Sequence, residues 1–478
     1  MDSRDFRRLG HELVDWIADY RDRLDELPVM SRADPGDVRD QLPAEPPQSH
    51  DGLDRVPLDL EDIVLPGITH WNHPGWLAYF PSNTDLSSVL ADLVSSGLGA
   101  QGMNWQTSPA CTEVEDVMME WLRSMLGLPE EFSGVIQDTA STATLCALLC
   151  ARERATGHSQ EGAGFAAQPA PLIVYASDQA HSSILKATML SGIGRDNLRL
   201  VETDAEHAMA PDALATAVEQ DLAAGRTPCA VVATVGTTAT TAIDPLEEIA
   251  RIALERGLWL HVDAAMGGSA MICPENRPLW AGVETADSLV LNPHKWLGTG
   301  FDLSAYYIRD ADHLVRTMGT DPSYLRTARD GSVRNLRDWG IPLGRRFRAL
   351  KLWFVIRDQG VEGLQRRIRR DMANARRLGE LVDAAADWER LAPVPLQTVC
   401  LRHVPEALRD DEQALAIHNL TIADAVNAGG RYCITPSVVK GVQLIRVSVG
   451  ALPTELEHVE GAWAALQQAA EGTLSRTP

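Results

Sequence analysis

The segment 288–300 reads SLVLNPHKWLGTG, and it places a lysine directly after a predicted buried strand. Residues 288–291 have the short apolar pattern of a strand inside a sheet. Asn292, His294 and Lys295 follow at once, and all three are polar. A lysine at a strand end usually just reaches solvent, so the question is why this amine lies between an imidazole and an indole.

Three more apolar runs are similar to this one, and they alternate with helical patterns such as 110–126. They are LIVYAS (172–177), CAVVATVG (229–236) and LWLHVDAA (258–265). Strands that alternate with helices predict βαβ units, and therefore an α/β fold with a mostly parallel central sheet flanked by helices. The carboxyl ends of such strands meet at one edge of the sheet, where ligands bind.

At 478 residues the chain is too long for one hydrophobic core, and its patterns divide it into three parts. Residues 1–85 open with an amphipathic helix and contain a Pro-rich connector, so we expect a helical N-terminal segment. Residues 86–360 hold the predicted strands and form the expected large domain. A helical pattern over 345–386 leads into residues 361–478, where a further helix and a possible hairpin predict a smaller C-terminal α+β domain.

Composition narrows the classes of partner. A formal charge of −23 and a pI of about 4.9 argue against nucleic acid or an anionic membrane. No apolar run reaches the roughly 18 residues of a membrane span, and the charged first residues predict no secretory signal. Seven cysteines without a CxxC pair fit a reducing cytosol. We therefore expect a cytoplasmic protein, and we expect no metal site.

Three side chains near predicted strand ends fit one cofactor. A lysine amine in a desolvated pocket, as expected for Lys295, has a lowered pKa and attacks aldehydes. The carboxylate of Asp263, which closes the strand WLHVD, can keep a pyridine nitrogen protonated, and the His181 ring can stack on the pyridine. Residues 139–141 come directly before an apolar helix, whose N-terminus suits a phosphate. These parts together fit pyridoxal 5′-phosphate.

Seven stretches in order between about residues 70 and 360 carry a resemblance to a known family. They are HPGWLAYFPS, SPACTEVEDVMMEWL, SDQAHSS, VATVGTT, LWLHVDAAMGGSAMICPE, NPHKW and IPLGRRFRALKLWFVIR. The chain resembles the group II pyridoxal-phosphate decarboxylases, specifically the aromatic-L-amino-acid decarboxylase family. The resemblance implies the aspartate aminotransferase-like fold (fold type I), pyridoxal 5′-phosphate as the cofactor, and a homodimer with active sites at the subunit interface.

The resemblance also implies roles for individual residues. Lys295 resembles the lysine that bonds the cofactor aldehyde, and Asp263 resembles the partner of the pyridine nitrogen. His181 resembles the ring-stacking histidine and His294 the histidine before the lysine, so we expect these four residues to be catalytic. The other positions that resemble cofactor contacts are Thr139, Ala140, Ser141, Thr238, Ala265 and Asn292.

A substrate pocket and a reaction follow from the same resemblance. The residues at substrate-contact positions are Trp71, Tyr79, Phe80, Pro81, Ser82, Gln101, Met103, Leu336, Gly344 and Arg446. The aromatic members suit an aromatic ring, and Gly344 leaves room for one as bulky as an indole. The implied reaction is decarboxylation of an aromatic L-amino acid (tryptophan, phenylalanine, tyrosine or dopa) to the amine and carbon dioxide. A non-aromatic amino acid stays open as an alternative substrate.

The sequence departs from the family pattern near the expected phosphate and near the expected substrate ring. Asp138 places an acid close to the phosphate, so its side chain should point away from it. Gln101 and Met103 stand where animal members carry bulkier apolar and aromatic residues, which leaves the ring preference open.

A third departure concerns the product. Residues 317–340 match a mobile catalytic loop, and Leu336 stands there in place of a tyrosine thought to protonate the substrate Cα in many decarboxylases. Leucine has no proton to give. Either another donor acts, or oxygen intercepts the carbanion and the products are aldehyde, ammonia and peroxide, as in an aromatic aldehyde synthase. The candidate donors are His181, His294, water and Tyr324.

Two further classes share parts of the pattern. An aminotransferase or desulfurase would share the fold and the lysine, but it usually binds the substrate carboxylate with an arginine. Arg446 in LIRVSVG is a candidate for that role, and it also matches an arginine of the decarboxylases. A non-catalytic binding or scaffold protein would have no reason to keep Lys295, Asp263 and His181 together.

Overall fold

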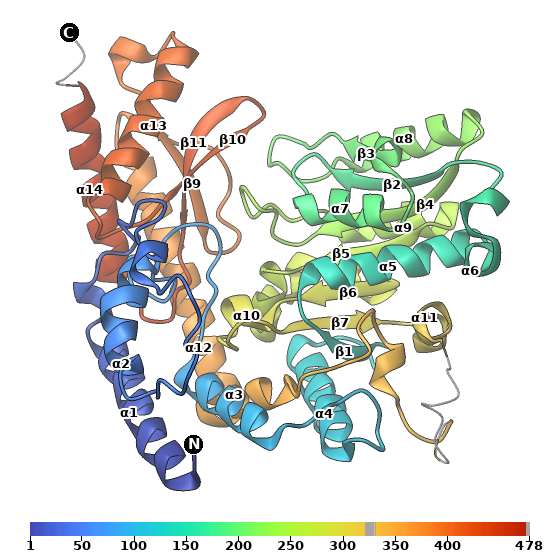
Figure 1. Cartoon of the computed structure of the whole chain (residues 1–478). Helices are drawn as coiled ribbons and strands as arrows, with labels where there is room; N and C mark the ends of the chain where they lie inside the picture. Colours follow the sequence, from blue (N-terminus) through green and yellow to red (C-terminus); the bar gives the residue numbers. More distant parts are fainter. Residues whose placement is uncertain (321–328, 330, 475–478) are drawn as a thin grey trace.

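The computed structural model describes residues 1–320, 329 and 331–474, apart from the side chains of 166 and 167. A seven-stranded sheet forms its centre, in the order β1-β7-β6-β5-β4-β2-β3 (Figure 1). The strands are β1 (Ser133–Gln137), β2 (Leu172–Ser177), β3 (Leu198–Val201), β4 (Thr227–Thr234), β5 (Trp259–Asp263), β6 (Ser288–Leu291) and β7 (Ser304–Ile308). Neighbours from β3 to β6 run parallel, whereas β7 runs antiparallel to β1 and β6. The predicted α/β fold with a mostly parallel sheet is confirmed.

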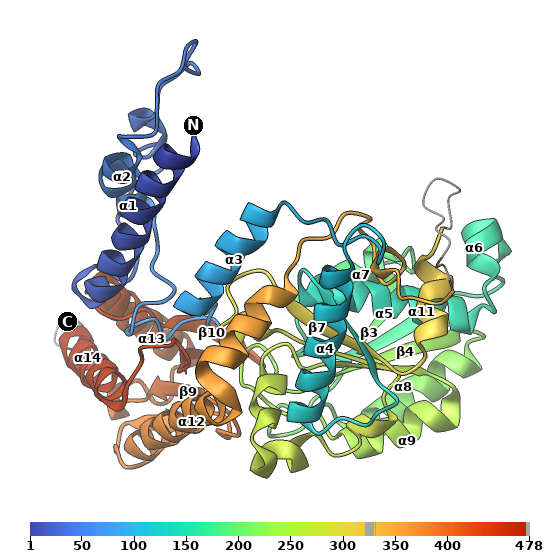
Figure 2. The same ribbon diagram turned by 90° about the horizontal axis from the view of Figure 1, so that it is seen from below.

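Helices cover both faces of this sheet (Figures 1 and 2). On one face lie α5 (Ala140–Ala155), α7 (Ser182–Leu190) and α11 (Ala311–Met318), with α6 (Ser159–Ala163) after α5. On the other face lie α4 (Pro109–Leu126), α8 (Pro211–Ala223), α9 (Leu246–Arg256) and the start of α12 (Ala349–Asp383). Along β2, Ile173 and Tyr175 join one core while Val174 and Ala176 join the other. This is why the sequence of β2 is apolar without alternation.

A second sheet organises the C-terminal part, in the antiparallel order β10-β11-β9-β8. Its elements are β8 (Trp388–Arg390), β9 (Thr398–His403), α13 (Glu412–Ala428), β10 (Thr435–Val439), β11 (Val442–Ser448) and α14 (Leu456–Leu474). The predicted hairpin forms here, because Lys440 and Gly441 both take positive φ in its two-residue turn. The small α+β unit is therefore present, although the exact boundaries at 85 and 360 stay a prediction.

Helix α12 joins the two parts (Figure 1). The sequence pattern predicts long helices over 345–386 without placing a boundary between them, and the structure has two helical halves that meet at Gly360, where φ is 63° and ψ is 166°. A glycine accepts this backbone conformation at little cost, so it permits the change of direction. The first half packs on α3 and α4, and the second half packs on β8, β9 and α14.

The N-terminal segment extends from the rest of the molecule (Figure 2). Apolar residues at helical spacing from Phe6 to Leu27 predict one helix there, but α1 (Ser3–Asp22) ends earlier, and α2 (Val56–Asp59) follows after the Pro-rich connector. Phe6 is 60% exposed. On α3 (Leu86–Leu98), Leu90, Leu93 and Leu98 are 49%, 51% and 64% exposed. Both helices thus carry apolar side chains that a single chain leaves uncovered.

The described residues contain neither a helix suited to crossing a membrane nor a cluster of metal-binding side chains. None of the helices there combines the length and apolar character needed to cross a membrane. Within the same residues, no three His, Cys, Asp or Glu side chains gather as a metal site would require.

Candidate functional site

The carboxyl ends of the central strands surround a cavity of about 200 Å³. Its lining comprises Phe80, Thr139, Ala140, Ser141, His181, Ser183, Thr234, Gly236, Thr238, Asp263, Ala265, Met266, Asn292 and Lys295. The structure thus brings together all the residues predicted to contact the cofactor. Strand β5 supplies Asp263, and α10 (Pro293–Trp296), directly after β6, supplies Lys295. Adjacent parallel strands bring these distant stretches to one edge.

Lys295 lies at the floor of this cavity in a desolvated setting. Burial lowers the pKa of its amine, while the carboxylate of Asp263 opposes that shift. Its Nζ lies 5.2 Å from the centre of the Phe80 ring. A lowered pKa leaves more of the amine uncharged at neutral pH, and the uncharged amine is the nucleophile.

Asp263 is buried at the end of β5 with one oxygen already used. Its Oδ1 accepts the N–H of Ala265 at 3.0 Å, which leaves Oδ2 available to a ligand. On the neighbouring strand, Thr234 pairs with Asp263 in register. Thr234 lines the cavity, and its buried hydroxyl has no hydrogen-bond partner among the described residues. A buried hydroxyl without a partner is costly, so it marks a position where a ligand is expected to bond.

The N-terminus of α5 forms another wall. Thr139 is its N-cap residue, but its side chain makes no capping hydrogen bond, so the first N–H groups of α5 stay available. Asp138 accepts the N–H of Thr139 at 2.6 Å, and its side chain does not line the cavity. Opposite, Asn292 accepts the Ser304 hydroxyl at 2.5 Å through Oδ1, which leaves its amide N–H groups free to donate. This set of donors suits a phosphate.

These observations test whether pyridoxal 5′-phosphate fits. The cavity combines a nucleophilic amine, a carboxylate with a free oxygen, unused helix N–H groups and an unpartnered hydroxyl. The cofactor needs a partner for its aldehyde, its ring nitrogen, its phosphate and its remaining oxygen. The residues present therefore fit the group.

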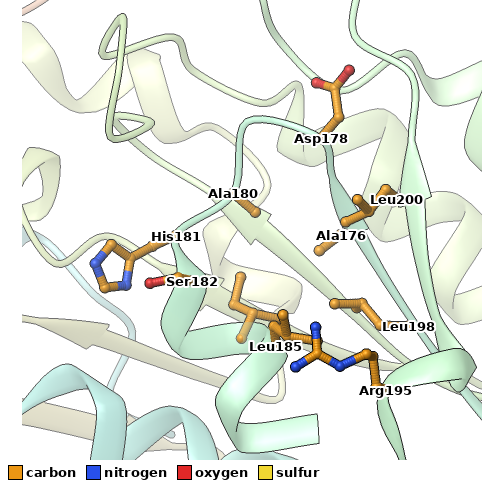
Figure 3. Close-up of a pocket in the computed structure, with 10 residues that line it drawn as sticks. Ala176, Asp178, Ala180, His181, Ser182, Leu185, Arg195, Leu198 and Leu200 are labelled. Atoms are coloured by element: carbon orange, nitrogen blue, oxygen red, sulfur yellow. The ribbon is translucent and has the colours of Figure 1, made fainter. Parts of the chain in front are cut away.

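His181 borders this cavity from the N-cap of α7. Its Nδ1 accepts the N–H of Ser183 at 3.1 Å, so the neutral ring carries its proton on Nε2. Desolvation lowers its pKa, and Asp263 opposes the shift. A separate cavity of about 320 Å³ lies on the other side, lined by Asp178, Arg195 and Leu200 among others. The imidazole extends away from those side chains (Figure 3).

A larger cavity of about 470 Å³ adjoins the first one. Its lining comprises Trp71, Tyr79, Phe80, Pro81, Ser82, His181, Thr238, His294, Lys295, Phe301 and Arg446. Trp71 and Tyr79 are packed with their ring centres 5.9 Å apart. The two cavities share Phe80, His181, Thr238 and Lys295. An aromatic side chain could therefore lie beside the amine at the junction of the cavities.

His294 and Phe301 form one side of the larger cavity, with ring centres 4.9 Å apart. His294 is buried, and this burial is the main cause that lowers its pKa to about 4, with a smaller effect from the nearby Lys295. Its Nδ1 accepts the N–H of Leu303 at 3.1 Å, so at neutral pH it presents Nε2–H. Phe301 was not predicted from the sequence, because an aromatic residue in a turn carries no pattern that distinguishes it.

Arg446 reaches the larger cavity from β11 in the C-terminal sheet. It is buried, and it donates to the carbonyls of Ala239 at 2.7 Å and Tyr79 at 3.2 Å. Its guanidinium also lies 5.3 Å from the centre of the Phe80 ring. Two of its guanidinium nitrogens therefore already donate to backbone carbonyls, which fits a structural role better than capture of a substrate carboxylate.

Four predicted substrate residues lie elsewhere in the described part of the chain. Gln101, Met103, Leu336 and Gly344 line neither cavity. Met103 and Gly344 belong to adjacent segments, since the N–H of Gly102 donates to the Arg345 carbonyl at 2.9 Å. Leu336 is 2% exposed and packs in the core beneath α11. Tyr324, a candidate proton donor, lies outside the described residues.

Several cavity residues escaped the sequence analysis. They are Ser183, Thr234, Gly236, Met266 and Phe301. Thr234 had a usable signal, because it lies near the end of a predicted strand, as Asp263 does. Ser183 lies in the first turn of α7, and the others lie in loops or turns, where sequence pattern does not indicate direction.

Comparisons with known proteins give consistent results. A family model described as "Pyridoxal-dependent decarboxylase conserved domain" matches residues 35–404. Phenylacetaldehyde synthase of Arabidopsis thaliana is 40% identical over 486 residues, covering 100% of this chain and 98% of the relative. Aromatic-L-amino-acid decarboxylase of Bos taurus is 41% identical over 487 residues, covering 99% and 98%. The crystal structure of Oryza sativa TDC with PLP and tryptamine has a TM-score of 0.95 at 36% identity, covering 99% of each chain.

Proposed function

Because the chain belongs to the pyridoxal-dependent decarboxylase family, we propose that it converts aromatic L-amino acids to the corresponding amines and carbon dioxide. It is an enzyme with pyridoxal 5′-phosphate as its cofactor. The observation that carries the substrate class is the junction of the two cavities. Lys295 and Phe80 line both, and the larger cavity is rimmed by Trp71 and Tyr79.

The roles of individual residues follow from their surroundings. When bound, the cofactor supplies an aldehyde that bonds an amine and a pyridine ring that accepts the electron pair left by a departing carboxylate. Lys295 would hold the aldehyde, since burial favours its uncharged form. Asp263, whose Oδ2 is unused, would keep the ring nitrogen protonated. Thr139, with the N–H groups that follow it, and Asn292 would hold the phosphate.

The two histidines differ as proton sources. Both present Nε2–H at neutral pH, because Nδ1 of each accepts a backbone N–H. A pKa of about 4 leaves His294 almost entirely uncharged at pH 7, so it is a hydrogen-bond donor more than an acid. His181, which borders both cavities, is therefore our candidate for delivering the proton to the substrate Cα, directly or through water.

A second product is favoured by one specific residue. By resemblance, Leu336 stands where many decarboxylases have the proton-donating tyrosine, and phenylacetaldehyde synthase of Arabidopsis thaliana is among the relatives. If protonation is slow, dioxygen oxidises the decarboxylated carbon and takes up two electrons and two protons to become hydrogen peroxide. Water then releases the aldehyde and ammonia, so one amino acid, one dioxygen and one water give one carbon dioxide, one aldehyde, one ammonia and one peroxide.

We also propose that the enzyme is a cytoplasmic homodimer with active sites at the subunit interface. The exposed leucines of α3 form an apolar face of the kind that subunits bury. The segment with Gln101 and Met103 lines neither cavity of its own chain, which fits a contribution to the site of a second subunit. All seven cysteines are unpaired thiols, as in reducing compartments.

The dimer can be tested by mixing two inactive variants. A Lys295→Ala subunit and a Met103→Asp subunit would each lack activity alone, but a mixed dimer has one intact site. Recovery of activity on mixing supports the shared site, whereas a monomer in sedimentation analysis would exclude it.

Product analysis under air tests the reaction. The cofactor-loaded enzyme is given tryptophan, phenylalanine, tyrosine and dopa, and carbon dioxide, amine, aldehyde and peroxide are all quantified. Carbon dioxide matched by amine supports the proposed decarboxylase. Carbon dioxide matched by aldehyde and peroxide would establish the second product instead, and the absence of carbon dioxide from all four would refute both.

A further inference from the structure

Asn83 bonds the backbone of Lys295 from outside the cofactor cavity. It lies two residues after Pro81 and is fully buried. Its amide nitrogen donates to the carbonyl of Lys295 at 2.9 Å and to the carbonyl of Gly450 at 2.7 Å. Its Oδ1 accepts the N–H of Leu452 at 3.0 Å. One side chain thus ties the lysine to the C-terminal part of the chain.

The next residue is held from α12. The Trp296 indole donates to Asp371 at 2.9 Å, and Arg367 donates to the Trp296 carbonyl at 2.7 Å. Asp371 is fully buried, and Arg370 neutralises it with bonds of 3.1 Å and 3.0 Å. The backbone around the lysine is therefore fixed by side chains from two other segments.

Such outside support is needed because α10 is only four residues long. The carbonyls at the end of a helix have no partner within it, and a single turn is not stable alone. The Lys295 carbonyl gains its partner from Asn83 and the Trp296 carbonyl from Arg367. The position of the Lys295 amine in the cavity consequently depends on these two bonds.

We propose that Asn83 is a positioning residue for Lys295, which sets the amine for its bond to the cofactor aldehyde. The inference rests on the proposed role of Lys295. Asn83 touches neither cavity, so it acts through the backbone of the lysine alone.

Asn419 provides a matched control. It is also fully buried, and it donates to the carbonyls of His403 at 2.9 Å and Leu415 at 3.0 Å. It accepts the N–H of His403 at 2.8 Å, so it makes the same three kinds of bond within the C-terminal part. Asn→Ala at either position removes equivalent interactions and should lower the thermal stability of the cofactor-free protein by a similar amount.

The experiment compares Asn83→Ala and Asn419→Ala as purified full-length proteins. We expect Asn83→Ala alone to raise the dissociation constant of pyridoxal 5′-phosphate about tenfold, the effect of one displaced hydrogen bond. It should also shift the pH at which the visible absorbance of the bound cofactor changes. Equal cofactor affinity and an unchanged absorbance titration in both variants would overturn the proposal.

Two further variants keep the test decisive. Asn83→Asp keeps the shape and the acceptor for Leu452 but donates to neither carbonyl, so it gives the same comparison, against Asn419→Asp, if the alanine variant does not fold. Lys295→Ala tests the proposed function itself. If Lys295→Ala keeps its turnover, the proposed role of Lys295 fails. If Lys295→Ala loses turnover but the Asn83 variants behave like the Asn419 variants, only the positioning role of Asn83 fails.

Discussion

Replacing Thr234 by valine should move two properties in opposite directions. Valine has the shape of threonine without the hydroxyl. Thr234 lines the cofactor cavity, and its buried hydroxyl has no hydrogen-bond partner in the part of the chain that the structure describes. An unsatisfied buried hydroxyl costs about 1–3 kcal/mol. In the cofactor-free protein the substitution removes that cost, so Thr234→Val should be more stable than the wild type.

The size of the effect follows from the length of the chain. An unfolding entropy of about 2 cal/mol/K per residue gives about 1 kcal/mol/K for 478 residues. The apparent Tm of the cofactor-free protein should therefore rise by about 1–3 °C. In the loaded enzyme the hydroxyl is expected to bond the cofactor, so its loss should raise the cofactor Kd about tenfold.

Differential scanning fluorimetry and a cofactor titration measure the two quantities. Thr188→Val is the matched control, because Thr188 is equally buried but its hydroxyl donates to the Ile184 carbonyl at 2.8 Å. It should lower the Tm and leave the cofactor Kd unchanged. A fall in Tm for Thr234→Val, or an unchanged cofactor Kd, would refute the reasoning.

Three more predictions concern the amine, the product and the pH. Lys295→Ala should abolish both turnover and the visible absorbance of the bound cofactor, and turnover that survives would show that the site is wrongly assigned. If the wild type makes aldehyde, Leu336→Tyr should shift the ratio of products toward amine. Leu336→Phe, whose side chain is similar in volume to tyrosine but has no hydroxyl, should leave the ratio unchanged. Equal product ratios in the two variants would mean that Leu336 does not decide the product. Burial lowers the pKa of His261 to about 4, so between pH 6.5 and 4 the folded protein binds fewer protons there than the unfolded one, and stability falls as the pH falls. The loss of stability from His261 amounts to about 2 kcal/mol at pH 5. Between pH 7.5 and 5 the Tm of His261→Gln should therefore fall about 2 °C less than the Tm of the wild type. His11→Gln, at an exposed histidine, is the control, and its Tm should change with pH as the wild type does.

The sequence was most informative where strands end. Lys295, Asp263 and Asn292 could be placed in one cavity because parallel strands bring their carboxyl ends to one edge, whatever lies between them in sequence. Thr234 follows the same rule and could have been found by it. Strand β2 was predicted to the residue, because an apolar run bounded by polar residues and buried on both faces leaves little choice.

What sequence pattern missed depends on distant contacts. The direction of Phe301 depends on a turn that has no periodicity. The change of direction at Gly360 could not be told from a tolerated glycine in one long helix. Asn83 reads as a loop residue, and only its bonds to Lys295 and Gly450 give it a role. Gln101 and Leu336 were assigned to the substrate pocket by resemblance, yet one chain does not bring them there.

Strand β11 and the loop after it contact Phe80 and Asn83, which lie beside Lys295. These contacts have a consequence for synthesis on the ribosome. The central sheet leaves the ribosome long before Arg446, Gly450 and Leu452, and N-terminal parts of a chain can begin to fold during translation. Until those three residues emerge, Asn83 has only the Lys295 carbonyl to bond, and Phe80 lacks the guanidinium beside its ring. A nascent chain can thus complete its largest sheet while its cofactor site is still unfinished. Stable uptake of the cofactor is therefore expected only once the last strand and the loop after it have emerged.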